Sequence, residues 1–150
     1  MNPHDKNAVL DLLSKWNMAP VQATPEVPDP ERDSVDIKHS FVALDADRIV
    51  GICSYIIIDR TMAETASLAV DPAYQGKHIG QRLQVARLNE MKEKGIKRVR
   101  TETDRPETIQ WYIRKFGYRI IGKNKKKHSF SLPHIDHWTV LELDLESREF

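Results

Sequence analysis

The chain has only one cysteine, Cys53, and it lies in the apolar run from Ile49 to Ile58. A single cysteine cannot form an intrachain disulfide, and no cluster of thiols is present to hold a metal ion. The composition therefore argues against a disulfide-stabilised secreted protein. We expect a cytoplasmic protein without a metal site, in which Cys53 is a packed thiol with too little access to serve as a nucleophile.

A long apolar segment and an excess of charge are also missing. No apolar run approaches the roughly 20 residues that cross a bilayer, and the early acidic residues Asp5 and Asp11 are untypical of a signal peptide. Lysine and arginine total 23 against 22 aspartate and glutamate, a formal net charge of +1. No global field therefore attracts nucleic acid or an anionic membrane, and we expect neither as a partner.

The remaining composition, 40% hydrophobic and 30% charged, fits one globular domain over residues 1–150. Four of the eight prolines fall within residues 18–35, where apolar periodicity is weak. This stretch is too long for a simple turn, so it predicts a loop inside the domain that is mobile or forms a wall of a substrate site.

Apolar spacing predicts helices over residues 3–17, from about 80 to 94 and from 106 to 116. It predicts strands at 41–44, 49–58, 64–70, 96–103, 118–121 and 138–145, with a polar connector over 122–137. Because a hairpin comes first and helical crossovers follow, we expect a mixed central sheet flanked by helices. The fold class is α/β, or α+β by some conventions.

Residues 75–80 read Gln-Gly-Lys-His-Ile-Gly and lie between a buried strand and a helix. Small residues allow a tight turn, so that successive amide N–H groups and the positive end of the helix face one anion. A pyrophosphate is the natural ligand of such a turn. The alternative is a plain connection in which glycine serves geometry alone, and glycine spacing does not separate the two.

The longer segment from Leu68 to Gly80 closely resembles the acetyl-CoA signature of the GNAT acetyltransferase superfamily, whose core is Arg/Gln-x-x-Gly-x-Gly/Ala. The segment from Trp111 to Tyr118 is similar to the family's Tyr-x-x-x-Gly-Phe ending of its last helix. The resemblance extends from about Ser40 to Leu145. It implies an acyl-CoA N-acyltransferase fold with acetyl-CoA as co-substrate.

The resemblance also implies a set of cofactor-binding residues. The strand ending at Val70 would present backbone groups to the pantetheine arm, and the amides of the turn would hold the pyrophosphate. His78 occupies the position of the family's first glycine, so the backbone there must avoid positive φ or accept modest strain. The implied residues are Leu68, Ala69, Val70, Gln75, Gly76, Lys77, His78, Ile79, Gly80 and Gln81.

Acylation of an amine requires a base that removes the amine proton, and an acid can protonate the departing CoA thiolate. Glu64 matches the position where histone-acetylating members of the superfamily carry a glutamate that acts as base through water. The alternative for Glu64 is a solvated or ion-paired strand end.

The acid is harder to assign from the sequence. The family's usual tyrosine lies four residues before the helix-ending glycine, and that position is Ile113 here. Tyr112 and Tyr118 are the fallback candidates. One residue turns a helical side chain by about 100°, so Tyr112 points elsewhere unless the helix end is distorted.

These observations predict an N-acetyltransferase that moves an acetyl group from acetyl-CoA directly to an amine of a small molecule or, less favoured, a protein. The alternative is a non-catalytic acyl-CoA-binding or sensing module of the same fold. The lysine cluster Lys123 to Lys127 suits a solvated hairpin tip, and alternatively the 3′-phosphate of CoA, an acidic substrate or nucleic acid. An uncovered sheet edge leaves a homodimer open.

Overall fold

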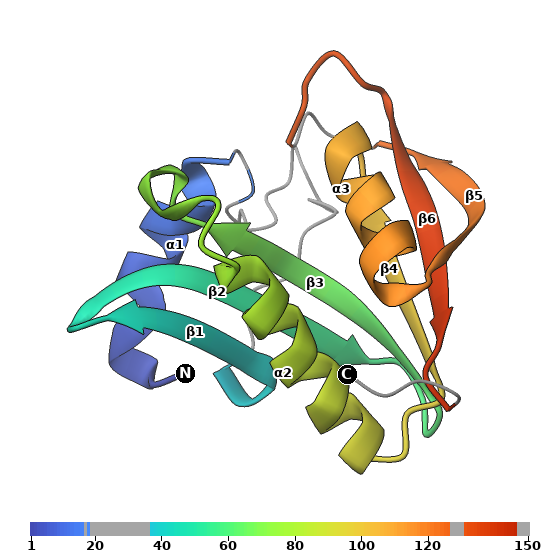
Figure 1. Cartoon of the computed structure of the whole chain (residues 1–150), viewed down its shortest axis with the longest axis horizontal. Coiled ribbons are helices and arrows are strands. Elements are labelled where there is room, and N and C mark those ends of the chain that lie inside the picture. The colour runs from blue at the N-terminus through green and yellow to red at the C-terminus, as the bar shows by residue number, and fades with distance from the viewer. Residues whose placement is uncertain (17, 19–36, 127–130, 147–150) are drawn as a thin grey trace, which may run out of the picture.

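The computed structural model describes residues 1–16, 18, 37–126 and 131–146. Within them, one sheet has the strand order β1-β2-β3-β4-β6-β5 (Figure 1). Only β3 and β4 pair in parallel, which confirms the predicted mixed sheet. The strands are β1 (Ser40–Asp45), β2 (Arg48–Ile57), β3 (Met62–Val70), β4 (Arg98–Thr103), β5 (Arg119–Lys125) and β6 (His137–Asp144).

Helices cover both faces of this sheet. α1 (Lys6–Ser14), preceded by a 3-10 turn at Pro3–Asp5, packs on one face of the β1–β3 half, and α2 (Ile79–Glu93) crosses the other face (Figure 1). α3 (Pro106–Trp111) continues into a π-helical turn, Tyr112–Phe116. No helix in the described part of the chain is long and apolar enough to cross a membrane.

The sequence predicts a loop at residues 18–35 and a connector at residues 122–137. The proline-rich loop predicted at 18–35 lies, apart from Met18, outside the described residues. The connector predicted at 122–137 is wrong at its start, because β5 continues to Lys125 and pairs with β6 as far as His137. All seven residues of β5 are exposed, so this edge strand carries the polar residues that usually indicate a loop.

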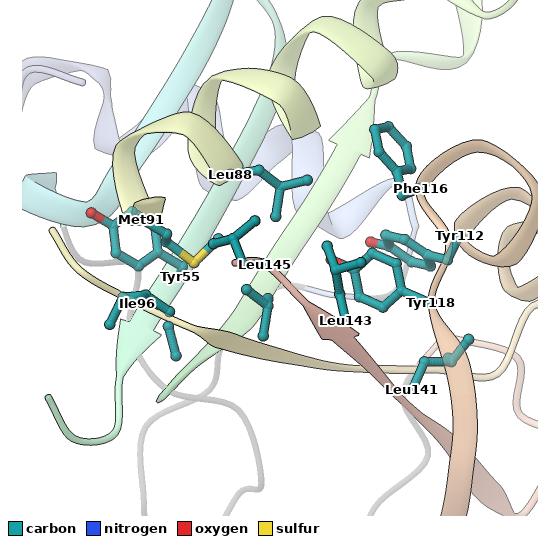
Figure 2. Packing of buried hydrophobic residues seen from close by; sticks show 12 residues of the cluster. Tyr55, Leu88, Met91, Ile96, Tyr112, Phe116, Tyr118, Leu141, Leu143 and Leu145 are labelled. Carbon is teal, nitrogen blue, oxygen red and sulfur yellow. The ribbon is translucent and has the colours of Figure 1, made fainter. Parts of the chain in front are cut away.

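The main core joins the two halves of the sheet. Leu88 and Met91 of α2 pack with Leu141 and Leu143 of β6 and with Phe116 of the π-helical turn (Figure 2). Each fully buried side chain of this size stabilises the fold by roughly 1.5–3 kcal/mol. The core therefore holds α2 and the π-helical turn in fixed positions beside each other.

Gly51 sets how closely α2 approaches the sheet. A Cβ at this position would lie 2.9 Å from Leu83 Cδ1 and 3.2 Å from Ile79 Cγ2. The first contact is shorter than real Cβ atoms show and the second is tight, so glycine at residue 51 allows the first turn of α2 to lie this close to β2. The N-terminus of α2 is thereby placed beside the end of β3.

Candidate active site

The candidate site begins where β3 and β4 separate. The two strands pair only at three positions, Met62 with Arg98, Ala63 with Val99 and Glu64 with Arg100. A register shift against β2 at residues 65–67 marks a bulge in β3, and bulges bend a strand. Beyond this point the two halves of the sheet diverge (Figure 1), and a cavity of about 550 Å³ lies between them.

The cavity has two walls. The first consists of β3 residues 65–70, residues 74–76 and 78–81 of the turn and the start of α2, Arg87 farther along α2, and Trp16 and Met18 from the N-terminal segment. The second consists of residues 101–105 at the end of β4, residues of α3, Tyr112 and Lys115 of the π-helical turn, and Ser131 and Trp138. The described residues contain no group of three or more histidine, cysteine, aspartate or glutamate side chains arranged to hold a metal.

The turn before α2 has the geometry of an anion site. Gly76 has φ 79° and His78 has φ 60° and ψ 20°, so His78 does accept the left-handed conformation. The first backbone N–H bonded within the helix is that of Arg82, to His78 O at 3.1 Å. The amides of the three preceding residues, 79–81, have no intrahelical acceptor, and the positive end of the helix dipole faces the same cavity.

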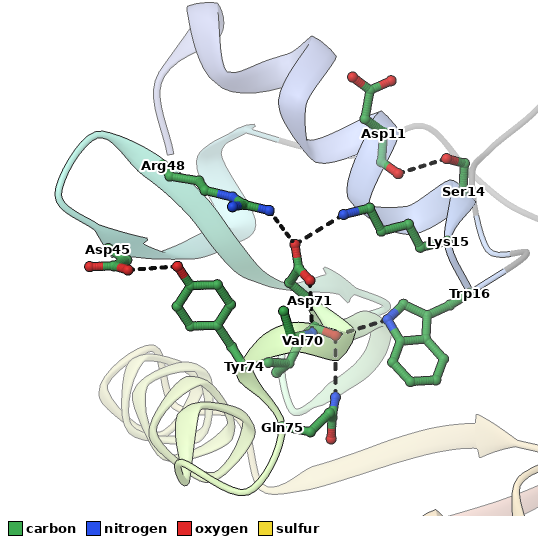
Figure 3. Close-up of polar contacts among 11 residues, drawn as sticks. Asp11, Ser14, Lys15, Trp16, Asp45, Arg48, Val70, Asp71, Tyr74 and Gln75 are labelled. Atoms are coloured by element: carbon green, nitrogen blue, oxygen red, sulfur yellow. Dashed lines mark hydrogen bonds and ion pairs between the residues drawn. The ribbon is translucent and has the colours of Figure 1, made fainter.

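The predicted cofactor-binding residues lie together along the first wall, except for one. The exception is Lys77, whose Nζ lies 5.1 Å from the centre of the Tyr74 ring instead of lining the cavity. The carbonyl of Val70 is also occupied, since Trp16 Nε1 and Gln75 Nε2 both donate to it, at 2.9 and 3.2 Å (Figure 3). The backbone groups of β3 that remain toward the cavity therefore precede this carbonyl.

Asp71 anchors this wall to the rest of the fold. Its carboxylate accepts hydrogen bonds from Ala73 N, Lys15 Nζ and Arg48 Nη2, at 3.0 to 3.1 Å (Figure 3). The Ala73 amide, followed by the Lys15 side chain, lowers the pKa of Asp71 below its ordinary value. The carboxylate thus ties α1, β2 and the turn to one point.

Tyr112 faces the cavity because the end of α3 is distorted. Gly117 N–H donates to both Ile113 O and Tyr112 O, and the turn is π-helical, which inserts one extra residue. The residue five positions before the glycine, rather than four, therefore lines the cavity. Tyr112 is 3% exposed, whereas Ile113 packs against the core.

Tyr118, the other predicted acid, does not line the cavity. It is 2% exposed, and its hydroxyl accepts a hydrogen bond from Gln84 Nε2 at 2.9 Å. Burial raises the pKa of Tyr118 well above its ordinary range. Its place is in the core beneath the site.

Arg87 is a cavity residue that sequence reasoning missed. Its side chain is fully buried, and it donates to Gln84 Oε1 at 2.6 Å, Ser67 O at 2.7 Å, Ser54 O at 3.0 Å and the hydroxyl of Tyr112 at 3.1 Å. The sequence did indicate that this side chain is buried, because residue 87 shares the apolar face of α2 with Leu83, four residues earlier.

The predicted base, Glu64, is half-buried and does not line the cavity. It lies at the last position where β3 is still paired with β4, opposite Arg100. Glu102 lies two residues farther along β4, beyond the separation, and does line the cavity. Its Oε1 accepts a hydrogen bond from Asn124 Nδ2 at 2.9 Å. Sequence reasoning missed Glu102, although its place at the end of a strand was a signal.

The lysine cluster is divided by the fold. Lys123 and Lys125 are exposed on β5, while Lys127 lies outside the described residues. Lys126 is neither at a solvated tip nor in an open patch: its side chain is 5% exposed and its Nζ lies 2.6 Å from Oδ2 of Asp104, which is 1% exposed. That part of the prediction is wrong, because a tertiary carboxylate draws one lysine inward.

The environment of Asp104 is strongly polar. Burial raises its pKa, but hydrogen bonds from Lys126, the amide of Leu132 and Ser131 outweigh this and hold the pKa below its ordinary value. The other carboxylate oxygen, Oδ1, has no hydrogen-bond partner among the described residues. Asp104 lines the cavity, as does Trp138, and Lys126 Nζ lies 4.6 Å from the centre of the Trp138 ring.

Comparison with known proteins decides the family. Residues 36–120, more than half of the chain, match the family model described as "Acetyltransferase (GNAT) domain". The chain belongs to this acetyltransferase family. The GNAT domain is therefore an acyltransferase, as the motifs at residues 68–80 and 111–118 predicted. No curated protein sequence matches the chain.

Solved structures agree on the fold. Ard1 from Thermoplasma volcanium has 22% identity and a TM-score of 0.75, covering 96% of this chain and 93% of its own. The ribosomal-protein-S18-alanine N-acetyltransferase from Escherichia coli has 13% identity and a TM-score of 0.72, covering 100% and 96%. A GNAT family acetyltransferase from Elizabethkingia anophelis with acetyl-CoA bound has 22% identity and a TM-score of 0.60, covering 70% and 74%. These likenesses confirm the acyltransferase fold of this GNAT domain.

Proposed function

We propose that this GNAT acetyltransferase moves the acetyl group of acetyl-CoA directly to the amine of an acceptor, a small molecule in preference to a protein. Acetyl-CoA is the co-substrate of the family, and the relative from Elizabethkingia anophelis was crystallised with it. One observation carries the proposal: a single cavity is lined by the turn before α2, the open edge of β3 and Tyr112.

The residues along the first wall fit a CoA molecule. The amides of residues 79–81 at the start of α2 suit the pyrophosphate, since they have no acceptor in the helix. The edge of β3 at Leu68 and Ala69 suits the amides of the pantetheine arm, since β4 no longer pairs with it there. The carbonyl of Val70 is excluded from this role, because Trp16 and Gln75 occupy it.

The chain must provide for two proton transfers. A C–N bond forms as the amine attacks the thioester carbonyl, and the C–S bond breaks. Tyr112 donates its phenolic proton to the departing sulfur, because its oxygen already accepts a hydrogen bond from Arg87 and its own hydrogen is left to donate. Glu102 takes the proton of the acceptor nitrogen, directly or through one water molecule.

The role of Glu64 as the general base stays a prediction. It lies at the closed end of the separation between β3 and β4, so a role for it requires a chain of water molecules. Glu102 is preferred because it lines the cavity and Glu64 does not. Comparing the kcat of Glu64→Gln with that of Glu102→Gln distinguishes which glutamate acts as the base.

Cys53 supports direct transfer rather than an acyl-enzyme intermediate. The thiol is fully buried and its Sγ lies 3.4 Å from Leu83 O. Burial raises the pKa of Cys53 above its ordinary value, and the thiolate is the nucleophilic form. The acceptor and acetyl-CoA must then be bound together.

A small acceptor is favoured by the crowded end of the second wall. Trp138 is 2% exposed there, and the Arg105 guanidinium lies 4.8 Å from the centre of the Trp16 ring. Trp16 belongs to the first wall and Arg105 to the second, so their contact bridges the two walls and narrows the space left for an acceptor. A protein acceptor is the second candidate, since the relative from Escherichia coli acetylates an alanine of a ribosomal protein.

The test is release of free CoA thiol from acetyl-CoA by the purified protein. The acceptors offered are polyamines, aminoglycosides, free amino acids and peptides with a free N-terminus. We expect turnover with at least one small amine, and a fall in kcat of about 10²-fold in Glu102→Gln, with a smaller effect in Glu64→Gln. CoA binding measured by calorimetry, with no turnover for any amine, would support the non-catalytic alternative; absence of CoA binding would contradict both.

We make three further proposals about this protein. They are a single domain over residues 1–150, a cytoplasmic location, and a homodimer formed through an uncovered strand. β1 and β5 are the two edges of the sheet, and β5 is exposed along its length. Light scattering of the purified protein measures the oligomeric state directly.

A further inference from the structure

Within the part of the chain that the structure describes, the charge of Arg87 has no anionic partner. All five guanidinium hydrogens belong to a side chain that is fully buried, and its four acceptors are two main-chain carbonyls, an amide oxygen and a phenol. No carboxylate forms an ion pair with Arg87 among the described residues. The cavity therefore has a fixed positive charge beneath one wall.

Burial of an uncompensated charge lowers the stability of the folded state. Arginine cannot lose its proton in a protein, and a buried charge costs several kcal/mol unless an opposite charge compensates it. An apolar residue of similar volume would satisfy the packing of α2 at lower cost. The charge is best explained by an anion that forms in the cavity only during the reaction.

Among residues 1–16, 18, 37–126 and 131–146, no permanent anion near Arg87 compensates its charge. Glu90, one turn farther along α2, is engaged by the hydroxyl of Tyr55. Cys53 on β2 is a buried thiol whose pKa is raised. Tyr118 reaches Arg87 only through Gln84. Tyr112 is the titratable group in direct contact with Arg87, and both side chains belong to residues that line the cavity.

We propose that Arg87 is the counter-charge for the CoA thiolate and acts through the hydroxyl of Tyr112. This rests on the proposed function, since it assigns the leaving sulfur to the Tyr112 side of the cavity. Arg87 is a positioning residue, because it touches Tyr112 rather than the reacting atoms. It holds the phenol oxygen with an N–H, so that the O–H points to the sulfur.

The proton balance follows from these contacts. When the C–S bond breaks, the electron pair stays on sulfur and the sulfur takes the proton of Tyr112. The resulting phenolate oxygen keeps its hydrogen bond from Arg87 Nη2, so the negative charge is moved next to a fixed positive one. Solvent then returns a proton to the phenolate.

Arg87 also holds the edge of β3. Its Nη1 donates to Ser67 O on β3 and to Ser54 O on β2, next to the bulge that separates β3 from β4. One guanidinium therefore fixes both the acid and the strand that suits the pantetheine arm. A change at this residue should affect catalysis more than the binding of CoA, because the anion-binding turn lies at the opposite end of the first wall.

The experiment measures the affinities of CoA and acetyl-CoA by calorimetry from about pH 7 to about pH 9. CoA has a free thiol and acetyl-CoA does not, so their affinity ratio isolates the thiolate. In the wild type, we expect CoA to gain about tenfold over acetyl-CoA across this range, because one unit of pKa corresponds to a tenfold change in affinity. In Arg87→Met, we expect the ratio to become independent of pH.

Two variants guard against a change in folding. Arg87→Lys keeps the positive charge but loses the planar set of N–H donors of the guanidinium, so we expect it to retain part of the pH response. A purely structural role for Arg87 predicts instead that the Lys and Met variants behave alike. Arg98→Met removes an exposed arginine of β4 and should leave the ratio unchanged. With an acceptor in hand, Arg87→Met should lower kcat at least tenfold while KM for acetyl-CoA changes less than about threefold.

The outcomes separate the two proposals. If neither CoA nor acetyl-CoA binds to the wild type, the proposed function fails. If both bind and their ratio depends on pH equally in the wild type and Arg87→Met, or does not depend on pH in the wild type, this inference alone is overturned. If Arg87→Met does not fold, Arg87→Lys is compared with the wild type. A partly retained pH response in Arg87→Lys supports the inference, and an absent response overturns it.

Discussion

The two walls of the cavity are built in different ways. The wall formed by β3, the turn and α2 offers mainly backbone groups, placed by two left-handed residues, Gly76 and His78. The opposite wall, from β4, α3 and β6, offers side chains, and its buried polar groups on Asp104 and Tyr112 each depend on a specific partner. A wall of backbone groups tolerates changes of side chain, whereas a wall of buried polar side chains does not.

The largest effect on stability is expected at the second wall, in Lys126→Met. This change leaves the buried carboxylate of Asp104 without its counter-charge, and removal of one partner of a buried ion pair costs about 3–5 kcal/mol. Urea denaturation measures the loss. Lys123→Met, at an exposed lysine of β5, should change stability by less than about 0.5 kcal/mol. Equal losses in the two variants would show that the pair is not desolvated.

The same pair gives a pH dependence with a defined sign. The folded pKa of Asp104 is lowered, so its contribution to stability is complete above the unfolded pKa of about 3.9 and is lost as pH falls through the folded pKa. In Lys126→Met the carboxylate gains from protonation instead. The stability difference between wild type and variant should therefore shrink below about pH 4, as measured by denaturation at several pH values.

The next prediction compares two buried tyrosines near the second wall. Tyr112→Phe removes the proton donor and should lower kcat by about 10²-fold, while the Kd for CoA stays within about threefold. Tyr118→Phe leaves Gln84 Nε2 without its acceptor and should cost about 1–3 kcal/mol of stability. Its kcat should change little. The reverse pattern, with Tyr118→Phe the slower enzyme, would remove Tyr112 from the mechanism.

The smallest effects are expected at the first wall. His78→Gly relieves a left-handed conformation and should stabilise the protein by about 0.5–1 kcal/mol, with the Kd for CoA nearly unchanged. Gly76→Ala has the opposite sign: a Cβ there meets nothing within 4 Å, so its cost of about 1 kcal/mol comes only from φ 79°. Thermal denaturation and calorimetry with CoA measure both. A large loss of CoA affinity in His78→Gly would mean that the imidazole itself binds the ligand.

Much of the first wall could be predicted from the sequence. Strand 64–70, the turn at 75–80 and the helix that follows are local features, since glycine positions and apolar spacing act over a few residues. Nine of the ten predicted cofactor residues line the cavity, with Lys77 the exception. The roles of these residues in binding CoA stay predictions until the affinities are measured.

The second wall was harder to predict because its chemistry depends on contacts between distant segments. Tyr112 lies next to the expected position, and only the π-helical turn brings it to the cavity. Lys126 has the appearance of one member of a solvated cluster, and only Asp104, 22 residues earlier, makes it a buried partner. Glu64 fits a family position, yet the extent of pairing between β3 and β4 keeps it from the cavity wall.

By itself, the sequence determined the family, the mixed sheet and the turn before α2, because local backbone preferences and hydrophobic periodicity depend on neighbouring residues. The tertiary structure alone decided which glutamate and which tyrosine face the cavity and that Arg87 lies buried against Tyr112. These are consequences of where two strands separate and how one helix ends. Such positions are set by packing across the whole domain, and no short segment contains that information.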